Sequence, residues 1–154
     1  MPTTDESIVI PVAPEELFDY LNDPTHMPQW DATILSSELE GDGPVRVGTR
    51  FKGKSRILGR TFDWKAEVTE DERPTKQSIK SVEGKIDFTG TYTLTPEAGG
   101  TRLIYHLESG AGLGGVFGRI ADALVNKTYA RQVRANLATL SEILTEHKDH
   151  GAAD

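Results

Sequence analysis

Apolar and polar residues alternate along most of the chain between residues 50 and 108. In the segment 61–69, Phe62, Trp64, Ala66 and Val68 share one parity, and the residues between them are mostly charged. Residues two apart point to the same face of a β-strand. The same alternation predicts strands over 50–58, 86–95 and 102–108, with weaker ones over 32–39 and 77–82. Threonines and charged residues occupy the alternate positions of these strands. They indicate a solvated face, which is typical of an antiparallel sheet.

The first thirty residues predict one strand and two short helices. Residues 7–12 are rich in β-branched residues, and Pro11 places this strand at a sheet edge or near the end of the strand. Residues 13–21 form a short helix in which Pro14 suits the first turn and two glutamates suit the positive helix start. A second short helical turn covers 25–30. Turns are expected at 41–44, 70–74, 83–85 and 96–100.

The segment from Gly110 to His147 is the longest helical pattern, and it begins with a glycine-rich run. It alone is long enough to cover the apolar face of the sheet. At about 100° per residue, two apolar stripes fall on nearly opposite sides of the helix. The first contains Phe117, Ile120, Ala121 and Leu124; the second contains Tyr129, Val133, Leu137, Leu140 and Leu144.

Two arrangements account for the opposed stripes. The helix breaks near Asn126, or it is continuous and the first stripe packs elsewhere, for example under loops at a cavity mouth. In the continuous helix Asp122 and Asn126 face the sheet and line the cavity. Either way, 113–125 is a candidate gate that glycines connect to the last strand.

Length and composition limit the class of protein. A chain of 154 residues is predicted to be one domain over 1–154, with an ordered core over 5–147 and a flexible tail over 148–154. It has no cysteine, and its net charge of −7 argues against a nucleic-acid partner. No apolar run reaches the roughly 20 residues of a membrane span, and the N-terminus has no secretory signal pattern. We therefore expect a cytoplasmic protein without an integral membrane segment.

No motif predicts a catalytic centre or a cofactor. The glycine run 110–115 matches a dinucleotide-binding turn, but no second parallel strand follows it. The four histidines have no metal-ligand spacing, and no Ser-His-Asp arrangement stands out. We expect neither metal nor cofactor, and the catalytic residues are unknown. Lys52, Lys54, Arg56 and Arg60 form a basic strip, interpreted as a solvated strand face.

The strand positions predicted to face inward contain most of the aromatic residues. Small residues lie between them, such as Gly53, Ser55, Ala66 and Gly90. Small residues at the centre of an inward face leave space for a pocket lined by aromatic rings. The residues predicted to contact a ligand are Trp30, Phe51, Ser55, Phe62, Trp64, Phe88, Tyr92, Tyr105, Phe117, Asn126 and Tyr129.

Four stretches together resemble the SRPBCC (START-like) superfamily, in its polyketide cyclase/dehydrase and lipid-transport branch. They are Ala-Pro-Glu-Glu-Leu-Phe at 13–18, Met-Pro-Gln-Trp at 27–30, the hairpin over 92–105, and the final long helix. The resemblance implies an α+β helix-grip fold, in which a curved seven-stranded antiparallel sheet wraps the C-terminal helix around a hydrophobic cavity. It also implies ligands such as lipids, sterols, polyketides or plant hormones, and aromatase/cyclase activity in some members.

Three functions remain open from the sequence. The favoured one is binding of a hydrophobic or aromatic small molecule, lipid-like or polyketide-like, in the cavity. The alternative is a polyketide aromatase/cyclase, which needs an arginine or carboxylate beside Trp64 or Tyr92. The nearest arginine is Arg56. The alternation directs its side chain to the outer face, unless a bulge near Gly59 reverses the direction of the side chains. A third, an interaction module using the basic strip, predicts a filled core. The oligomeric state is open.

Overall fold

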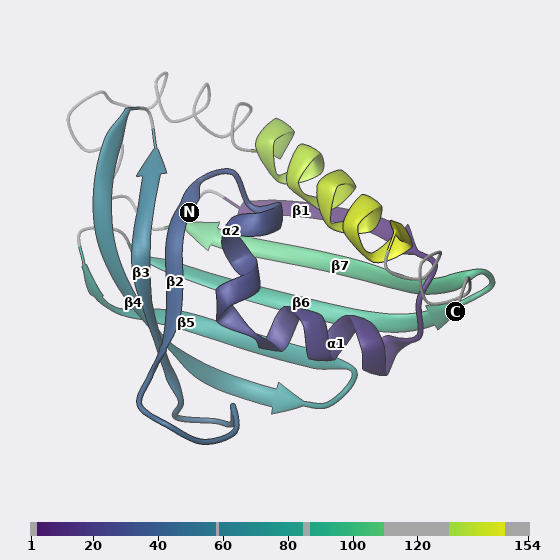
Figure 1. Cartoon of the computed structure of the whole chain (residues 1–154), viewed down its shortest axis with the longest axis horizontal. Coiled ribbons are helices and arrows are strands. Elements are labelled where there is room, and N and C mark those ends of the chain that lie inside the picture. Colours follow the sequence, from purple (N-terminus) through teal and green to yellow (C-terminus); the bar gives the residue numbers. More distant parts are fainter. Residues whose placement is uncertain (1–2, 58, 85–86, 110–129, 147–154) are drawn as a thin grey trace.

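The seven strands form one antiparallel sheet that curves around a helix (Figure 1). The computed structural model describes residues 3–57, 59–84, 87–109 and 130–146. The strand order is β1-β7-β6-β5-β4-β3-β2, so every neighbouring pair except β1 and β7 is consecutive in sequence. The strands are β1 (Thr3–Ile10), β2 (Ile34–Glu40), β3 (Arg50–Ile57), β4 (Arg60–Glu72), β5 (Lys76–Gly84), β6 (Phe88–Glu97) and β7 (Gly100–Ser109).

The helices lie on one face of this sheet (Figure 1). They are α1 (Pro14–Asn22), the 3-10 turn η1 (Pro24–His26), α2 (Met27–Trp30) and a C-terminal helix over 130–146. Val133, Leu137, Leu140 and Leu144 are buried, which confirms that the described part of the second predicted stripe packs into the core. No described helix is long and apolar enough to cross a membrane.

The helix α1 begins and ends as its sequence predicts. Pro14 occupies the first turn with two glutamates beside it, where a missing N–H costs nothing and negative charge is favoured. Leu17, Phe18 and Leu21 are buried against the sheet. The Asp23 side chain then accepts from the Thr25 N–H and begins η1.

Several strand bounds differ from the sequence prediction. The strand β1 begins at Thr3, which leaves Pro11 just beyond its end. The strand β4 continues through Glu72, because Glu72 pairs with Lys76 where a turn over 70–74 was expected. Charged residues fit there since one face of the sheet is open to water. The loop predicted over 96–100 shrinks to Ala98 and Gly99.

Pro96 lies inside β6, where a proline would normally interrupt a ladder. The pairing of β5 with β6 ends at Lys76 and Thr93, so at Pro96 only β7 remains as a neighbour. A proline is tolerated at such a local edge because its missing N–H leaves no strand unsatisfied.

Register shifts interrupt the ladders at three places. One lies between Ile34 and Ser36 of β2, and two lie between β4 and β5, at Lys65/Ala66 and Val68/Glu70. An extra residue in one strand bends it and increases its twist. The register shifts therefore bend the sheet locally at β2, β4 and β5.

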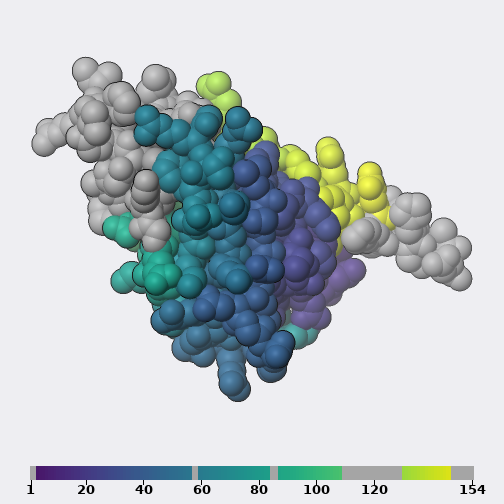
Figure 2. All heavy atoms as spheres, turned by 60° about the vertical axis from the view of Figure 1, so that its left-hand side comes forward, coloured from purple at the N-terminus to yellow at the C-terminus, as the bar shows by residue number. Residues whose placement is uncertain are grey.

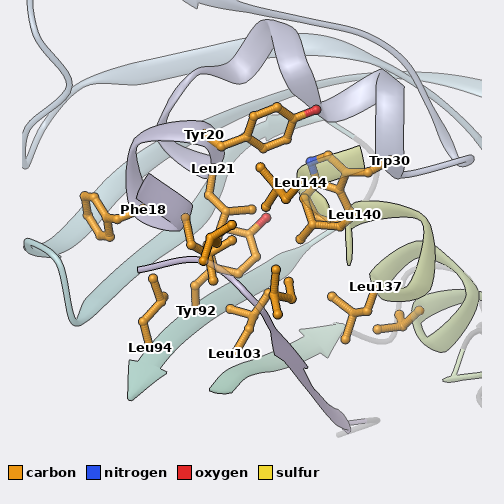
Figure 3. Packing of buried hydrophobic residues seen from close by; sticks show 14 residues of the cluster. Phe18, Tyr20, Leu21, Trp30, Tyr92, Leu94, Leu103, Leu137, Leu140 and Leu144 are labelled. Carbon is orange, nitrogen blue, oxygen red and sulfur yellow. The ribbon is translucent and has the colours of Figure 1, made fainter. Parts of the chain in front are cut away.

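The buried residues form two clusters on the concave face. The helix cluster joins β1, β6 and β7 to the helices (Figure 3): Ile10, Val12, Leu17, Phe18, Tyr20, Leu21, Trp30, Tyr92, Leu94, Leu103, Val133, Leu137, Leu140 and Leu144. The Trp64 cluster lies over β3 to β5: Met27, Phe51, Trp64, Ala66, Val68 and Ile79, with Ile34, Leu39, Val45 and Phe88 packed against it. The described C-terminal helix contributes to the helix cluster only.

Several predictions concern residues outside the described part of the chain. They are the break near Asn126, the gate over 113–125, the tail over 148–154, and the lining residues Phe117, Asn126 and Tyr129. The choice between a broken and a continuous helix therefore stays open.

Candidate functional site

The concave face brings together inward side chains from all seven strands. On β3 and β4, the inward cross-strand pairs are Phe51 with Ala66, Gly53 with Trp64, and Ser55 with Phe62. Phe51, Ser55 and Trp64 are buried, and Phe62 is half-buried. The inward parity predicted from the alternation is therefore confirmed for these strands.

Three aromatic rings form a group in the helix cluster. Tyr92 and Tyr105 are direct cross-strand partners with ring centroids 5.1 Å apart. Trp30 meets Tyr92 edge-on at 6.3 Å. Such tilted and edge-on contacts suit the charge distribution of aromatic rings. Trp30, predicted as a lining residue, packs here with Leu140 and Leu144 of the C-terminal helix.

A second aromatic pair lies in the Trp64 cluster. Trp64 meets Phe88 edge-on, with ring centroids 6.3 Å apart and an interplanar angle of 81°. Trp64 also lies against the backbone of Gly53: a Cβ added at Gly53 would be 2.7 Å from Trp64 Cζ2 and 2.0 Å from the carbonyl oxygen of Ser36. Only glycine lets β2 and the indole ring approach this closely. Figure 2, which brings β2 to β4 forward, shows these strands as a continuous surface, and Trp64 is buried.

Gly90 separates the two aromatic groups on the sheet. It lies between Phe88 and Tyr92 on β6 and is paired with Ile79 and Leu107. A Cβ added there would meet only ordinary contacts, the nearest at 3.7 Å, with the Tyr105 hydroxyl at 3.8 Å. We call Phe88, Gly90, Tyr92 and Tyr105 the Gly90 floor. Its centre has no side chain although the residue itself is buried.

Two indole donors are buried without a hydrogen-bond acceptor among the described residues. They are Nε1 of Trp30 and Nε1 of Trp64. A buried donor without a partner costs about 1–3 kcal/mol, and native proteins contain few of them. Both therefore require an explanation in terms of what surrounds them.

A buried polar contact links α2 to the C-terminal helix. The Asp31 Oδ1 accepts from the Thr33 N–H, the Thr33 hydroxyl and Asn136 Nδ2, at 2.9, 2.6 and 3.0 Å. Asn136 Oδ1 in turn accepts from the Ala32 N–H and from Gln132 Nε2. Burial raises the pKa of Asp31, and the hydrogen bonds from Thr33 and Asn136 oppose that rise.

Asn136 was not among the predicted site residues, although a signal for it exists. It follows Val133 by three residues and precedes Leu140 by four. That spacing places it on the same side of the helix as the buried stripe. Asn126, the asparagine that was predicted in the site, lies outside the described residues.

Two further polar groups near the site, Glu6 and Gln77, have partners at its rim. Glu6 lies opposite Tyr105 on the inward parity of β1 and pairs with Arg134 of the C-terminal helix at 3.8 Å. Gln77, buried and paired with Tyr92, donates to Asn22 Oδ1 at 2.6 Å. Within the described ranges, no three histidine, aspartate or glutamate side chains gather to hold a metal ion.

The basic strip lies on the outer face, as its parity predicts. Lys52 pairs with Glu38 and Lys54 with Asp63, and all four side chains are largely exposed. Arg56 is exposed too, and its register with Thr61 is regular through this part of the hairpin. Arg56 therefore does not reach the concave face.

The fold and the sequence agree on the class of protein. The seven-stranded antiparallel sheet with a C-terminal helix packed on it is the helix-grip fold that the sequence resemblance implied. The family model described as polyketide cyclase / dehydrase and lipid transport matches residues 1–145. The chain belongs to this family. No curated protein matches the sequence.

Solved structures share the fold at low sequence identity. TTHA0849 from Thermus thermophilus is 24% identical, with a TM-score of 0.77 over 95% of this chain and 99% of that one. A START superfamily protein from Mycobacterium smegmatis is 14% identical, with a TM-score of 0.74 over 94% and 97%. The di-domain ARO/CYC StfQ from the steffimycin biosynthetic pathway is also 14% identical, with a TM-score of 0.74 over 96% of this chain and 52% of that one.

Proposed function

We propose that the protein binds a hydrophobic or aromatic small molecule, lipid-like or polyketide-like, between the sheet and the C-terminal helix. The Gly90 floor carries this proposal. Aromatic side chains flank a buried position without a side chain, where one added methyl group would meet its neighbours at ordinary contact distances of 3.7–3.8 Å. Ligand sites in proteins are mostly apolar and aromatic, with few polar groups. Membership of a lipid-transport and polyketide-cyclase family supports the same ligand class.

Binding is favoured over catalysis by the positions of the charged groups. A cyclase would need an acid, base or arginine next to the bound molecule. The outward position of Arg56 removes the arginine that the sequence offered. Two inward carboxylates, Glu6 and Asp31, are engaged by Arg134 and by Thr33 and Asn136. A third, Asp71, pairs with Gln77 and has a buried Oδ1 without a partner among the described residues. The cyclase alternative draws its support from the structural similarity to StfQ, which its name describes as an ARO/CYC.

The experiment adds bulk to the Gly90 floor and measures binding of N-phenyl-1-naphthylamine, whose emission rises in an apolar environment. Gly90→Leu should weaken binding at least about tenfold, because a branched side chain occupies the space above the strand. Gly90→Ala adds one methyl group, which fits, and should weaken binding less. Thr93→Leu is the matched control, since Thr93 has outward parity on the same strand.

Circular dichroism shows whether each variant keeps the fold. Failure of the wild-type protein to bind the probe would contradict the proposal. So would equal affinities for the wild type, Gly90→Ala and Gly90→Leu, because the ligand would then lie elsewhere. To separate binding from catalysis, a linear polyketone is incubated with the protein and its products are followed. A product distribution that is unchanged by the protein supports binding alone.

A further inference from the structure

We infer that the ligand carries a hydrogen-bond acceptor oxygen, such as a carbonyl, and that the indole N–H of Trp64 donates to it. This inference rests on the proposed function and specifies the chemistry of its ligand. A purely hydrocarbon ligand would leave this donor unsatisfied. The oxygen-bearing ring systems of polyketides would satisfy it.

The first observation is the missing partner. Nε1 of Trp64 is fully buried, and no described residue accepts its hydrogen. Its neighbours in the Trp64 cluster are hydrocarbon or thioether side chains, which offer no strong acceptor. Its own cluster therefore cannot satisfy the donor.

The second observation is that the ring is held in place. Gly53 lets the indole lie against the β3 backbone, and Phe88 meets it edge-on. Trp64 is only 7% exposed. A donor fixed in this way before the ligand arrives costs little ordering entropy when it binds, which is how a polar group confers specificity in an apolar site.

The third observation separates Trp64 from Trp30, whose indole nitrogen also lacks an acceptor among the described residues. Trp30 packs beside Leu140 and Leu144, where the C-terminal helix closes over it (Figure 3). Both rings border the Gly90 floor, since Trp64 contacts Phe88 and Trp30 contacts Tyr92. The Trp64 cluster, however, contains no residue of the described C-terminal helix, and Trp30 therefore serves as the comparison.

The experiment compares 9-fluorenone with fluorene, two rigid ring systems that differ by a carbonyl in place of a methylene. Each competes with N-phenyl-1-naphthylamine for the wild type, Trp64→Phe and Trp30→Phe. The ratio of the fluorene Kd to the fluorenone Kd should fall roughly three- to tenfold in Trp64→Phe. It should change little in Trp30→Phe. Using the ratio removes the difference in hydration between the two compounds.

A second measurement uses the unaltered protein. The chain has two tryptophans, so its ¹H–¹⁵N spectrum contains two indole signals, which the two variants assign. Fluorenone should move the Trp64 signal downfield, and fluorene should not.

An unchanged Kd ratio in Trp64→Phe would overturn the inference, as would an equal response of the Trp64 signal to both compounds. Either result leaves the proposed function intact, provided that the compounds displace the probe. If neither compound binds and the probe itself does not bind, the proposed function fails instead.

Discussion

The two clusters on the concave face contain similar residue types, but different elements enclose them. The helix cluster is closed by leucines of the C-terminal helix and by α1, and it contains the largest fully buried aliphatic side chains. The Trp64 cluster is built mainly from neighbouring strands, with Met27 of α2. Aromatic residues on an inward face therefore have two uses. They fill a core around Trp30, and they border Gly90, a position left without a side chain; Tyr92 does both.

The largest expected effect comes from opening the helix cluster. Leu140 is 0% exposed, and Leu140→Ala should lower the free energy of unfolding by about 2–5 kcal/mol because it leaves a cavity. Urea denaturation measures the change. Glu142→Ala, on the exposed side of the same helix, should change stability by less than about 0.5 kcal/mol. Equal effects of the two substitutions would show that this helix does not close the core.

A smaller effect is expected where the Trp64 cluster meets the backbone of β2. Gly53→Ala should cost about 1–3 kcal/mol, because the new methyl group would collide with the Ser36 carbonyl and the Trp64 ring. Gly90→Ala is the matched control in the same sheet, and its methyl group meets only ordinary contacts. Thermal unfolding of both variants measures the contrast. If Gly90→Ala lost more stability than Gly53→Ala, the space above Gly90 would be tightly packed and the space above Gly53 would be open.

The smallest effect is a pH dependence in the contact between α2 and the C-terminal helix. Because burial raises the pKa of Asp31, the folded protein holds its proton to higher pH than the unfolded chain. Its contribution is then fully present below the unfolded pKa of about 3.9 and is lost as pH rises through the folded pKa. Asp31→Asn keeps an oxygen for all three donors and cannot ionise.

The difference in unfolding free energy, Asp31→Asn minus wild type, should therefore increase as pH rises above about 4. Urea denaturation over a series of pH values measures it. Asp42→Asn makes the same chemical change at an exposed position and is the matched control. A difference for Asp31→Asn that falls with pH would mean that the ionised carboxylate is the favoured form in the fold.

The sheet was the most predictable part of the molecule. Strict alternation, as in β4, β6 and β7, determines which side chains point inward, because a shift by one residue would expose the whole apolar face. The same pattern does not determine where a strand ends. Glu70 to Glu72 look like a turn in sequence, yet pairing with β5 extends the strand through them. Ladder contacts from a neighbouring strand outweigh local preference there.

The candidate site was predictable in its residue types and not in its grouping. The alternation identified Trp64, Phe88 and Tyr92 as inward, but it does not reveal that Gly90 separates two aromatic groups. Helical spacing places Asn136 on the buried side of its helix, but it does not reveal that Asp31 is its partner. Nor does the sequence show that Trp64 lacks an acceptor, since that depends on every neighbour in the cluster.

The pairing of β1 with β7 also affects the order of folding. The strands β2 to β7 follow one another in space as in sequence, whereas Thr3 pairs with Glu108 and Ile10 with Thr101. Closing so long a loop costs chain entropy before its contacts repay it. We therefore expect the six-stranded meander to form first and β1 to join late. Contacts made by β1 would then slow unfolding more than they speed folding, and the first strand would serve mainly to keep a completed sheet closed.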